Sequence, residues 1–188
     1  TEKIDREVID QMPNCKIIAN YAVGYNNIDI DYAKKKNIIV TNTPDVLTES
    51  TADLTMALVL NCARRLSEGE RLLRAKKFKG WKPKLLLGME LKDKTFGILG
   101  AGRIGSAVAK RAKSFGTNII YVDSKRNQKL EKETKANKVE LRYLLKNSDI
   151  LSVHLPLNSQ TYHFFFLLRL NRLKRNSILI NTTRGEIV

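Results

Sequence analysis

Three glycines with the spacing of a phosphate-binding turn are the residues of this sequence best placed to do chemistry. Gly100, Gly102 and Gly105 follow the pattern G-x-G-x-x-G, between an apolar run typical of a buried strand and an amphipathic run typical of a helix. In that setting the first glycine permits a tight turn, the second lets the backbone approach a pyrophosphate, and the third lets helix and strand pack closely. The helix start offers free N–H groups to phosphates, and Arg103 and Ile104 lie within the turn, with Arg103 adding a positive charge. The motif therefore predicts a dinucleotide site.

An acidic residue, Asp123, ends the next predicted strand. An acid at this point accepts hydrogen bonds from the adenosine ribose hydroxyls and repels a 2′-phosphate, so NAD is the expected cofactor. Ser124 and Lys125 follow it and are further candidate cofactor residues. Because Lys125 and Arg126 would attract a phosphate, NADP stays an alternative. The competing interpretation, incidental glycines beside a surface aspartate, is disfavoured by the combination of context and spacing.

A turn of this kind must be held by alternating strands and helices, and the hydrophobic pattern predicts them. The predicted strands are residues 16–22, 38–41, 95–100, 118–123, 150–155 and 177–182, and the predicted helices are residues 27–36, 49–76, 103–115, 139–146 and 168–174. This alternation is typical of a parallel sheet with crossover helices, so the predicted fold class is α/β with a doubly wound (Rossmann) nucleotide domain. The irregular residues 78–93, which include Trp81, are interpreted as a connector laid over the surface.

The formal net charge of +15 is compatible with a nucleic-acid surface or with a lysine-rich solvated exterior. The Lys and Arg residues are spread along the chain and are interpreted as not interleaved with exposed aromatics, so no nucleic-acid partner is expected. No apolar run approaches the roughly 18 residues of a membrane span, and the N-terminal residues hold no apolar signal core. Cys15 and Cys62 are predicted to be buried free thiols and no metal site is predicted. These features predict a cytoplasmic protein without a membrane partner.

Five segments resemble, in order, the signature stretches of the D-2-hydroxyacid dehydrogenases. They are residues 22–29, 43–53, 97–105, 153–157 and 180–188. Residues 81–91 are most similar to the glyoxylate/hydroxypyruvate reductase branch of that family. The resemblance covers nearly the whole chain. It implies a homodimeric oxidoreductase that moves hydride between a nicotinamide dinucleotide and a small 2-keto or 2-hydroxy acid, such as glyoxylate or hydroxypyruvate.

The resemblance also implies roles for individual residues. Arg184 matches the arginine that binds the substrate carboxylate and polarises the keto oxygen, a task suited to a planar, permanently charged guanidinium. Val23 and Gly24 match positions whose backbone N–H groups hold the same carboxylate. The positions that match the cofactor-lining residues of the family are Thr51, His154, Leu155, Pro156, Thr161, Thr182, Thr183 and Arg184.

The family's proton donor is a histidine paired with a glutamate, and both come after the strand that precedes Arg184. This sequence stops before either position, so it is interpreted as an internal fragment that is inactive alone. His154 and His163 are expected to be structural with respect to proton transfer. The implied domains are part of a flavodoxin-like α/β substrate domain at residues 1–46 and the NAD-binding domain, with an interdomain helix, at residues 47–188.

Two alternatives stay open. A protein of the same fold could sense a dinucleotide and bind partners without turnover, as the related corepressors do. Residues 164–168, Phe-Phe-Phe-Leu-Leu, depart from the polar pattern usual in the family and offer no residue to cap a helix. This stretch is either a locally buried helix start or the product of a local reading-frame error.

Overall fold

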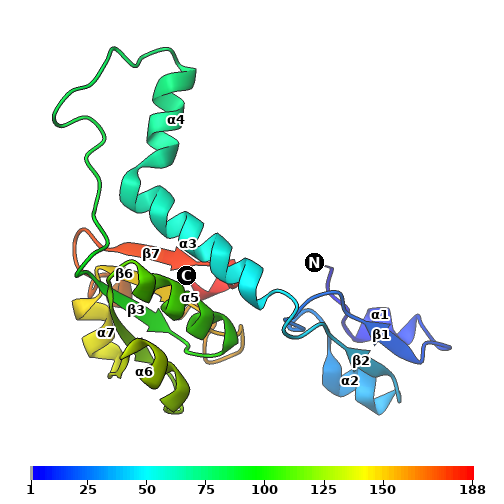
Figure 1. Ribbon diagram of the computed structural model, residues 1–188. Coiled ribbons are helices and arrows are strands. Elements are labelled where there is room, and N and C mark those ends of the chain that lie inside the picture. Colours follow the sequence, from blue (N-terminus) through cyan, green and yellow to red (C-terminus); the bar gives the residue numbers. More distant parts are fainter. Residues whose placement is uncertain (1) are drawn as a thin grey trace.

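The computed structural model describes residues 2–188 and builds them around parallel strands (Figure 1). The main strands are β3 (Thr95–Leu99), β4 (Asn118–Val122), β5 (Asn137–Lys138), β6 (Ile150–Val153) and β7 (Ile178–Asn181). They form one sheet in the order β5-β4-β3-β6-β7, with every pair parallel. A second, two-stranded parallel sheet pairs β1 (Ile17–Ala19) with β2 (Ile39–Thr41). The α/β class with a parallel sheet, predicted from the alternation of elements, is confirmed.

Helices cover both faces of the five-stranded sheet. One face carries α3 (Thr48–Arg64), α5 (Arg103–Ser114) and α6 (Gln128–Thr134), whose apolar side chains share a core with the sheet. The other face carries α7 (Leu141–Asn147) and α8 (Leu167–Leu170). Because β3 lies at the centre and is covered on both sides, its last four residues are all buried and its sequence does not alternate.

The strand register brings the candidate site residues to one edge of the sheet. Leu99 at the end of β3 is aligned with Val122 of β4 and with Val153 of β6, and Val153 is aligned with Asn181 of β7. The residues that follow these four strands therefore leave the sheet together. In open parallel sheets this carboxyl edge is where ligands bind.

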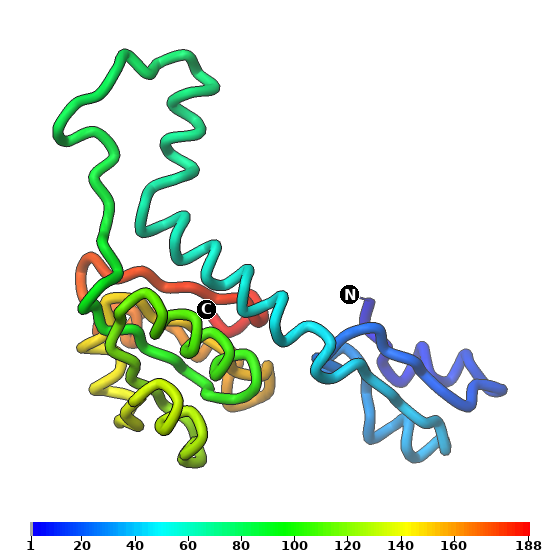
Figure 2. Tube along the Cα trace, in the orientation of Figure 1, coloured from blue at the N-terminus to red at the C-terminus, as the bar shows by residue number. Residues whose placement is uncertain are grey.

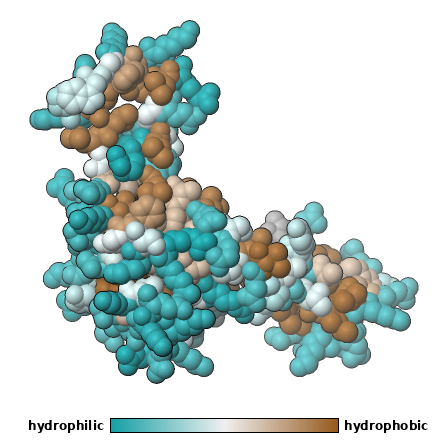
Figure 3. Space-filling view, viewed as in Figure 1, coloured by the Kyte–Doolittle hydropathy of each residue, from teal (hydrophilic) through white to brown (hydrophobic). Residues whose placement is uncertain are grey.

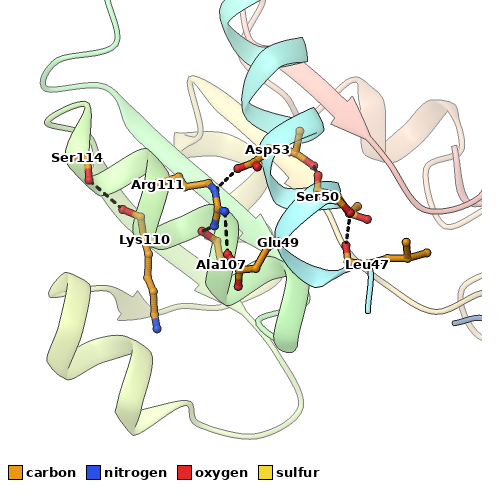
Figure 4. A network of polar contacts seen from close by, with 10 residues as sticks. Leu47, Glu49, Ser50, Asp53, Ala107, Lys110, Arg111 and Ser114 are labelled. Atoms are coloured by element: carbon orange, nitrogen blue, oxygen red, sulfur yellow. Dashed lines mark hydrogen bonds and ion pairs between the residues drawn. The ribbon is translucent and has the colours of Figure 1, made fainter. Parts of the chain in front are cut away.

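An arginine holds the long helix α3 against α5 (Figure 4). The Arg111 Nη2 atom lies 2.7 Å from Glu49 Oε2, and its Nε lies 2.7 Å from Asp53 Oδ1. Glu49 and Asp53 are one helical turn apart, so both carboxylates face the same guanidinium. Beneath this clamp the two helices pack through buried small and branched residues, including Val59 and Val108. The clamp fixes the direction in which α3 leaves the two-stranded sheet.

The predicted single helix over residues 49–76 is wrong, because the helix breaks at Arg65. Arg65 adopts φ 55°, and α4 (Leu66–Arg74) starts in a new direction. In an unbroken helix the Ala63 carbonyl would accept from the N–H of Ser67. Here it accepts instead from the N–H of Met89 at 2.7 Å, while the Ser67 N–H donates to Asn61 Oδ1 at 2.9 Å. A hydrogen bond from Met89 has thus replaced one hydrogen bond of the helix.

The segment from α4 to residue 90 projects from the body of the molecule, and we call residues 66–90 the arm (Figures 1 and 2). It does not lie over the surface as predicted for residues 78–93. Within the part of the chain that the structure describes, α4 has no buried residue. Apolar side chains gather on the arm (Figure 3), and Trp81 is 82% exposed.

The arm also contradicts the expectation that basic residues are not interleaved with exposed aromatic residues. Phe78 and Trp81 are both exposed, and lysines precede, separate and follow them. Basic and exposed aromatic residues are thus interleaved here, contrary to the expectation from the sequence.

A smaller unit precedes α3. It contains α1 (Arg6–Asp10), which the sequence pattern did not predict, and α2 (Ile30–Lys35), which is shorter than the predicted helix of residues 27–36. Asp29 sets the start of α2 by accepting from the Tyr32 N–H at 3.0 Å. Ile9, Ala33 and Ile38 form a core separate from that of the larger sheet. The proposed domain boundary after residue 46 falls between β2 and α3 and stays a prediction.

Several local expectations need correction. Neither cysteine is buried: Cys62 is exposed and Cys15 half-buried, and both are free. The helix predicted for residues 168–174 is the single turn α8, and it starts after Phe166 without a side-chain cap. Phe165 is buried, whereas Phe166 and the two leucines after it are exposed, so the unusual stretch is buried only in its first part. Helix α6 and strand β5 were not predicted.

None of the helices in residues 2–188 is both long and apolar enough to cross a membrane. No group of three or more His, Cys, Asp or Glu side chains in this part of the chain could hold a metal ion.

Candidate functional site

The glycine turn between β3 and α5 has the geometry of a phosphate cradle. Gly100 has φ +93°, and a Cβ there would lie 2.6 Å from the His154 carbonyl oxygen. A Cβ at Gly105 would collide with the Gly100 carbonyl, so the first turn of α5 rests directly on the backbone of the turn. A Cβ at Gly102 would meet no atom within 4 Å. Gly102, which caps α5, therefore faces open space where an anion can approach the helix N-terminus.

The peptide groups of Ala101 are held from both sides. Its N–H donates to Asp123 Oδ2 at 2.7 Å, and its carbonyl accepts from Asn127 Nδ2 at 2.8 Å. The Ser106 hydroxyl donates to the same carbonyl at 3.1 Å. Asp123, the predicted ribose acid, thus lies against the turn, half-buried, with its other carboxylate oxygen near the hydroxyl of Ser124.

Sequence reasoning missed Asn127. Its side-chain carbonyl accepts from the Leu130 N–H at 3.0 Å and starts α6, while its amide donates to Ala101 and to Ser106. The available signal was an N-cap residue type a few positions after a strand-ending acid. Because the hydrophobic pattern does not predict α6, that signal has no helix to which it can be assigned.

Arg103 and the predicted residue Lys125 lie at the mouth of the turn, and both are exposed. Arg103 Nη1 is 2.8 Å from Asp45 Oδ1, in the segment that crosses between the two sheets. This pair links the phosphate turn to the start of α3. Lys125 donates its backbone N–H to Asp123 Oδ1 at 3.4 Å.

A second group of candidates meets at the end of β7. Arg184 Nε donates to Asn26 Oδ1 at 3.3 Å, and Nη1 donates to the Thr183 carbonyl at 3.1 Å. A Cβ on Gly24 would collide with Arg184 Nη2. The structure therefore brings together Arg184 and the loop containing Gly24, which are far apart in the sequence. Asn26, which orients the guanidinium, was not predicted.

In the loop of Val23 and Gly24, asparagine side chains bind the backbone carbonyls and leave the N–H groups free within the part of the chain that the structure describes. The Val23 carbonyl accepts from Asn42 Nδ2 and the Gly24 carbonyl from Asn20 Nδ2, both at 2.9 Å. Among residues 2–188, no acceptor is paired with the N–H of Val23 or Gly24. Free N–H groups beside a guanidinium can bind a carboxylate.

Asn181 shapes the loop that carries Arg184. Its Oδ1 accepts from the Thr183 hydroxyl at 2.6 Å and from the Thr183 N–H at 3.0 Å, and its Nδ2 donates to the Arg184 carbonyl at 2.8 Å. The Thr182 hydroxyl lies 3.0 Å from that of Thr55, which donates to the Thr51 carbonyl at 2.8 Å. Thr51 and Thr182 are thus linked through one buried residue of α3.

The remaining candidates line the turn from β6. The His154 N–H donates to the Leu99 carbonyl at 2.7 Å, and this bond places His154 and Leu155 beside Gly100. Thr161 is buried, and its hydroxyl contacts the Pro156 carbonyl, so it stabilises its own loop. A role of Thr161 in cofactor binding stays a prediction.

His154 is half-buried, and its two ring nitrogens lie in different surroundings. Its Nε2 lies 2.9 Å from the Ser152 hydroxyl, and its Nδ1 is buried without a hydrogen-bond partner among residues 2–188. Burial lowers the pKa of His154 to about 4. The imidazole is therefore neutral at pH 7 and has no imidazolium proton to donate.

The sequence model of the family described as "D-isomer specific 2-hydroxyacid dehydrogenase, NAD binding domain" matches residues 56–188. The glyoxylate reductase of Thermococcus litoralis is 50% identical to this chain over 192 residues, an alignment that includes all of this chain and 58% of the relative. The chain thus spans somewhat more than half the length of that relative.

Two solved structures show the same architecture. A Thermus thermophilus protein superposes with a TM-score of 0.93 at 43% identity, over all of this chain and 58% of the other. The D-lactate dehydrogenase of Aquifex aeolicus, crystallised with NAD and lactic acid, gives a TM-score of 0.91 at 35% identity, over 99% of this chain and 55% of the other.

The half-buried His154 predicts a pH dependence of folding stability. An unfolded histidine gains its proton near pH 6.5, whereas the folded one does so only near pH 4, so protonation favours the unfolded chain between these values. The free energy of unfolding should fall as pH drops from 6.5 to 4, with a contribution of at most about 1.4 kcal/mol per pH unit. Urea unfolding at several pH values measures it.

The variant His154→Gln should lose this part of the pH dependence, and His163→Gln, at the only other histidine, is the control. Equal slopes for wild type and His154→Gln would show that His154 gains its proton as readily in the folded protein as in the unfolded chain.

Proposed function

Because the chain belongs to the D-isomer specific 2-hydroxyacid dehydrogenase family, we propose that it is part of an NAD-dependent reductase of a small 2-keto acid. Glyoxylate and hydroxypyruvate are the favoured substrates, since the glyoxylate reductase of Thermococcus litoralis is half identical to this chain. The observation that carries the proposal is the position of Arg184 against Gly24. It places a guanidinium beside free N–H groups at the carboxyl edge of the sheet.

The residues present fit a bound dinucleotide. The open face of Gly102 at the N-terminus of α5 suits the pyrophosphate, and Asp123 is the residue that would bind the adenosine ribose. Ile104 and Ser124 belong to the same two loops, and Leu155, Pro156 and Thr182 would line the nicotinamide half. A bound nicotinamide supplies the hydride that reduces the keto carbon.

The substrate carboxylate would lie between Arg184 and the N–H groups of Val23 and Gly24. In that position one arm of the guanidinium faces the carboxylate and another faces the keto oxygen, where negative charge develops during reduction. The hydrogen bond from Arg184 Nε to Asn26 holds the guanidinium plane in advance of substrate binding. By the family resemblance, the proton for the new hydroxyl comes from a histidine paired with a glutamate in sequence beyond β7.

We further assign the arm to contact with a second copy of the chain. A nine-residue helix is too short to persist alone in water, and α4 buries none of its residues within the described chain. The exposed leucines of α4, and Trp81 farther along the arm, therefore need another surface to cover them. Symmetric homodimers are the commonest assemblies that provide one.

The glycine turn gives a direct test of cofactor binding. In Gly102→Val the side chain would occupy the position of the pyrophosphate, and NADH affinity should fall by about 100-fold or more because several charge-assisted hydrogen bonds are lost. The fold should survive, since the space around Gly102 is open. Isothermal titration with NADH, together with a thermal melt, measures both. Unchanged affinity in a folded variant would place the phosphate site elsewhere.

Arg184 gives the test of the reaction. In the full-length protein, Arg184→Ala should lower kcat/KM for glyoxylate and hydroxypyruvate roughly 30- to 1,000-fold, because a charge-assisted bidentate interaction is lost. Arg184→Lys should recover only part of the loss, since the ammonium lacks the planar fork. NADH affinity should be nearly unchanged in both variants. Near-normal kcat/KM in Arg184→Ala would remove Arg184 from the site. A full-length wild-type protein that binds NADH but reduces no 2-keto acid would favour the dinucleotide-sensing alternative.

Sedimentation velocity tests the second copy. Wild type should sediment as a dimer at micromolar concentration, and the double variant Leu73→Glu with Trp81→Ser should shift to monomer because charge enters an apolar contact. Lys34→Gln, on the distant α2, controls for the change of one unit of charge. A wild-type monomer would refute this assignment.

A further inference from the structure

Arg126 lies close to the proposed adenosine end of the site. The loop that carries it is tied to the glycine turn on both flanks, because Asp123 accepts from the Ala101 N–H and Asn127 donates to the Ala101 carbonyl. A free guanidinium in this loop would attract a 2′-phosphate, which binds arginine by charge and by paired hydrogen bonds. The loop alone would therefore weaken the preference for NAD that Asp123 provides.

In the structure the Arg126 guanidinium is paired with the carboxylate of Glu131. Its Nε and Nη2 atoms both lie 2.8 Å from Glu131 Oε2. The two partners differ in exposure: the Arg126 side chain is 69% exposed and that of Glu131 only 16%. The carboxylate is thus the fixed partner, and the arginine folds back onto it.

Glu131 is fixed from beneath by Tyr121. The Tyr121 hydroxyl donates to Glu131 Oε1 at 2.7 Å and accepts from the Asn127 N–H at 2.9 Å. Tyr121 belongs to β4 and is fully buried, so the carboxylate is anchored to the core of the sheet. The hydrogen bond from Tyr121, followed by that from Arg126, lowers the pKa of Glu131, which is therefore ionised at neutral pH.

We infer that Glu131 is a specificity-determining residue for the cofactor: it binds Arg126 and withholds that cation from a 2′-phosphate. The inference rests on the proposed function, because it requires a dinucleotide at the glycine turn. Asp123 would disfavour NADPH by repelling the phosphate, and Glu131 would do so by neutralising the nearby arginine. Asp123 thus adds a repulsion of the 2′-phosphate, whereas Glu131 removes an attraction to it, and both effects favour NAD.

The test is the ratio of the dissociation constants of NADPH and NADH in Glu131→Gln. Glutamine keeps an oxygen for the Tyr121 hydroxyl but loses the charge that binds Arg126. NADPH affinity should rise about three- to tenfold relative to NADH, a range reduced for the solvent exposure of Arg126. Isothermal titration with each cofactor gives the ratio, and a thermal melt verifies that the variant is folded.

Glu133→Gln is the matched control. Glu133 lies on the same helix and pairs with Lys110 at 2.6 Å, so the substitution removes an equal charge and an ion pair without touching Arg126. The ratio should not change in this variant. A double variant, Glu131→Gln with Arg126→Gln, separates the freed arginine from the lost negative charge. If Arg126 is responsible, its ratio should match that of Arg126→Gln alone.

Three outcomes would overturn the inference: an unchanged ratio in Glu131→Gln, an equal shift in Glu133→Gln, or a shift that persists without Arg126. Failure of the proposed function looks different. If wild-type protein binds neither NADH nor NADPH, the dinucleotide site itself is absent. If it binds NADH normally and only the ratio fails to move, the role of Glu131 is refuted and the site stands.

Discussion

The contact between Gly105 and the Gly100 carbonyl is the constraint on which the rest of the site depends. It brings the first turn of α5 onto the end of β3 with no room for a side chain between them. The helix N-terminus is thereby aimed at the carboxyl edge of the sheet, where the residues after β4, β6 and β7 also emerge. Ala101 is held by Asp123 and Asn127 only because the turn is in this position.

The two sheets are joined mainly through α3, and polar contacts fix that connection. Arg111 holds the start of α3 on α5, Arg103 pairs with Asp45 in the crossing segment, and Thr55 meets Thr182 on the opposite side. A single exposed ion pair contributes little to the free energy of unfolding. The main effect of these pairs is therefore to orient α3. They determine where the loop of Gly24 arrives relative to Arg184, and the chemistry assigned to this pair requires that placement.

The sequence was sufficient for features that depend on local pattern. The parallel strands other than β5 follow from apolar runs, and the glycine turn follows from residues that leave few other conformations available. Features produced by distant contacts were not predictable in this way. The break at Arg65 depends on Met89 taking the carbonyl of Ala63, and nothing near Arg65 in the sequence announces it. Asn26 and Glu131 were missed for the same reason, since an exposed-type polar residue acquires its role only from the partner that the fold brings to it.

The exchange of hydrogen bonds at Ala63 determines the direction of the arm. One backbone bond, from Met89, and the close approach of Gly88 to the Ala63 carbonyl set the angle at which α4 departs. Because the arm projects from the body of the molecule (Figure 1), a small change in that angle would displace its far end more than its base. The orientation of the arm's exposed apolar surface therefore depends on Gly88, which lies against the bend between α3 and α4 and leaves no room for a side chain.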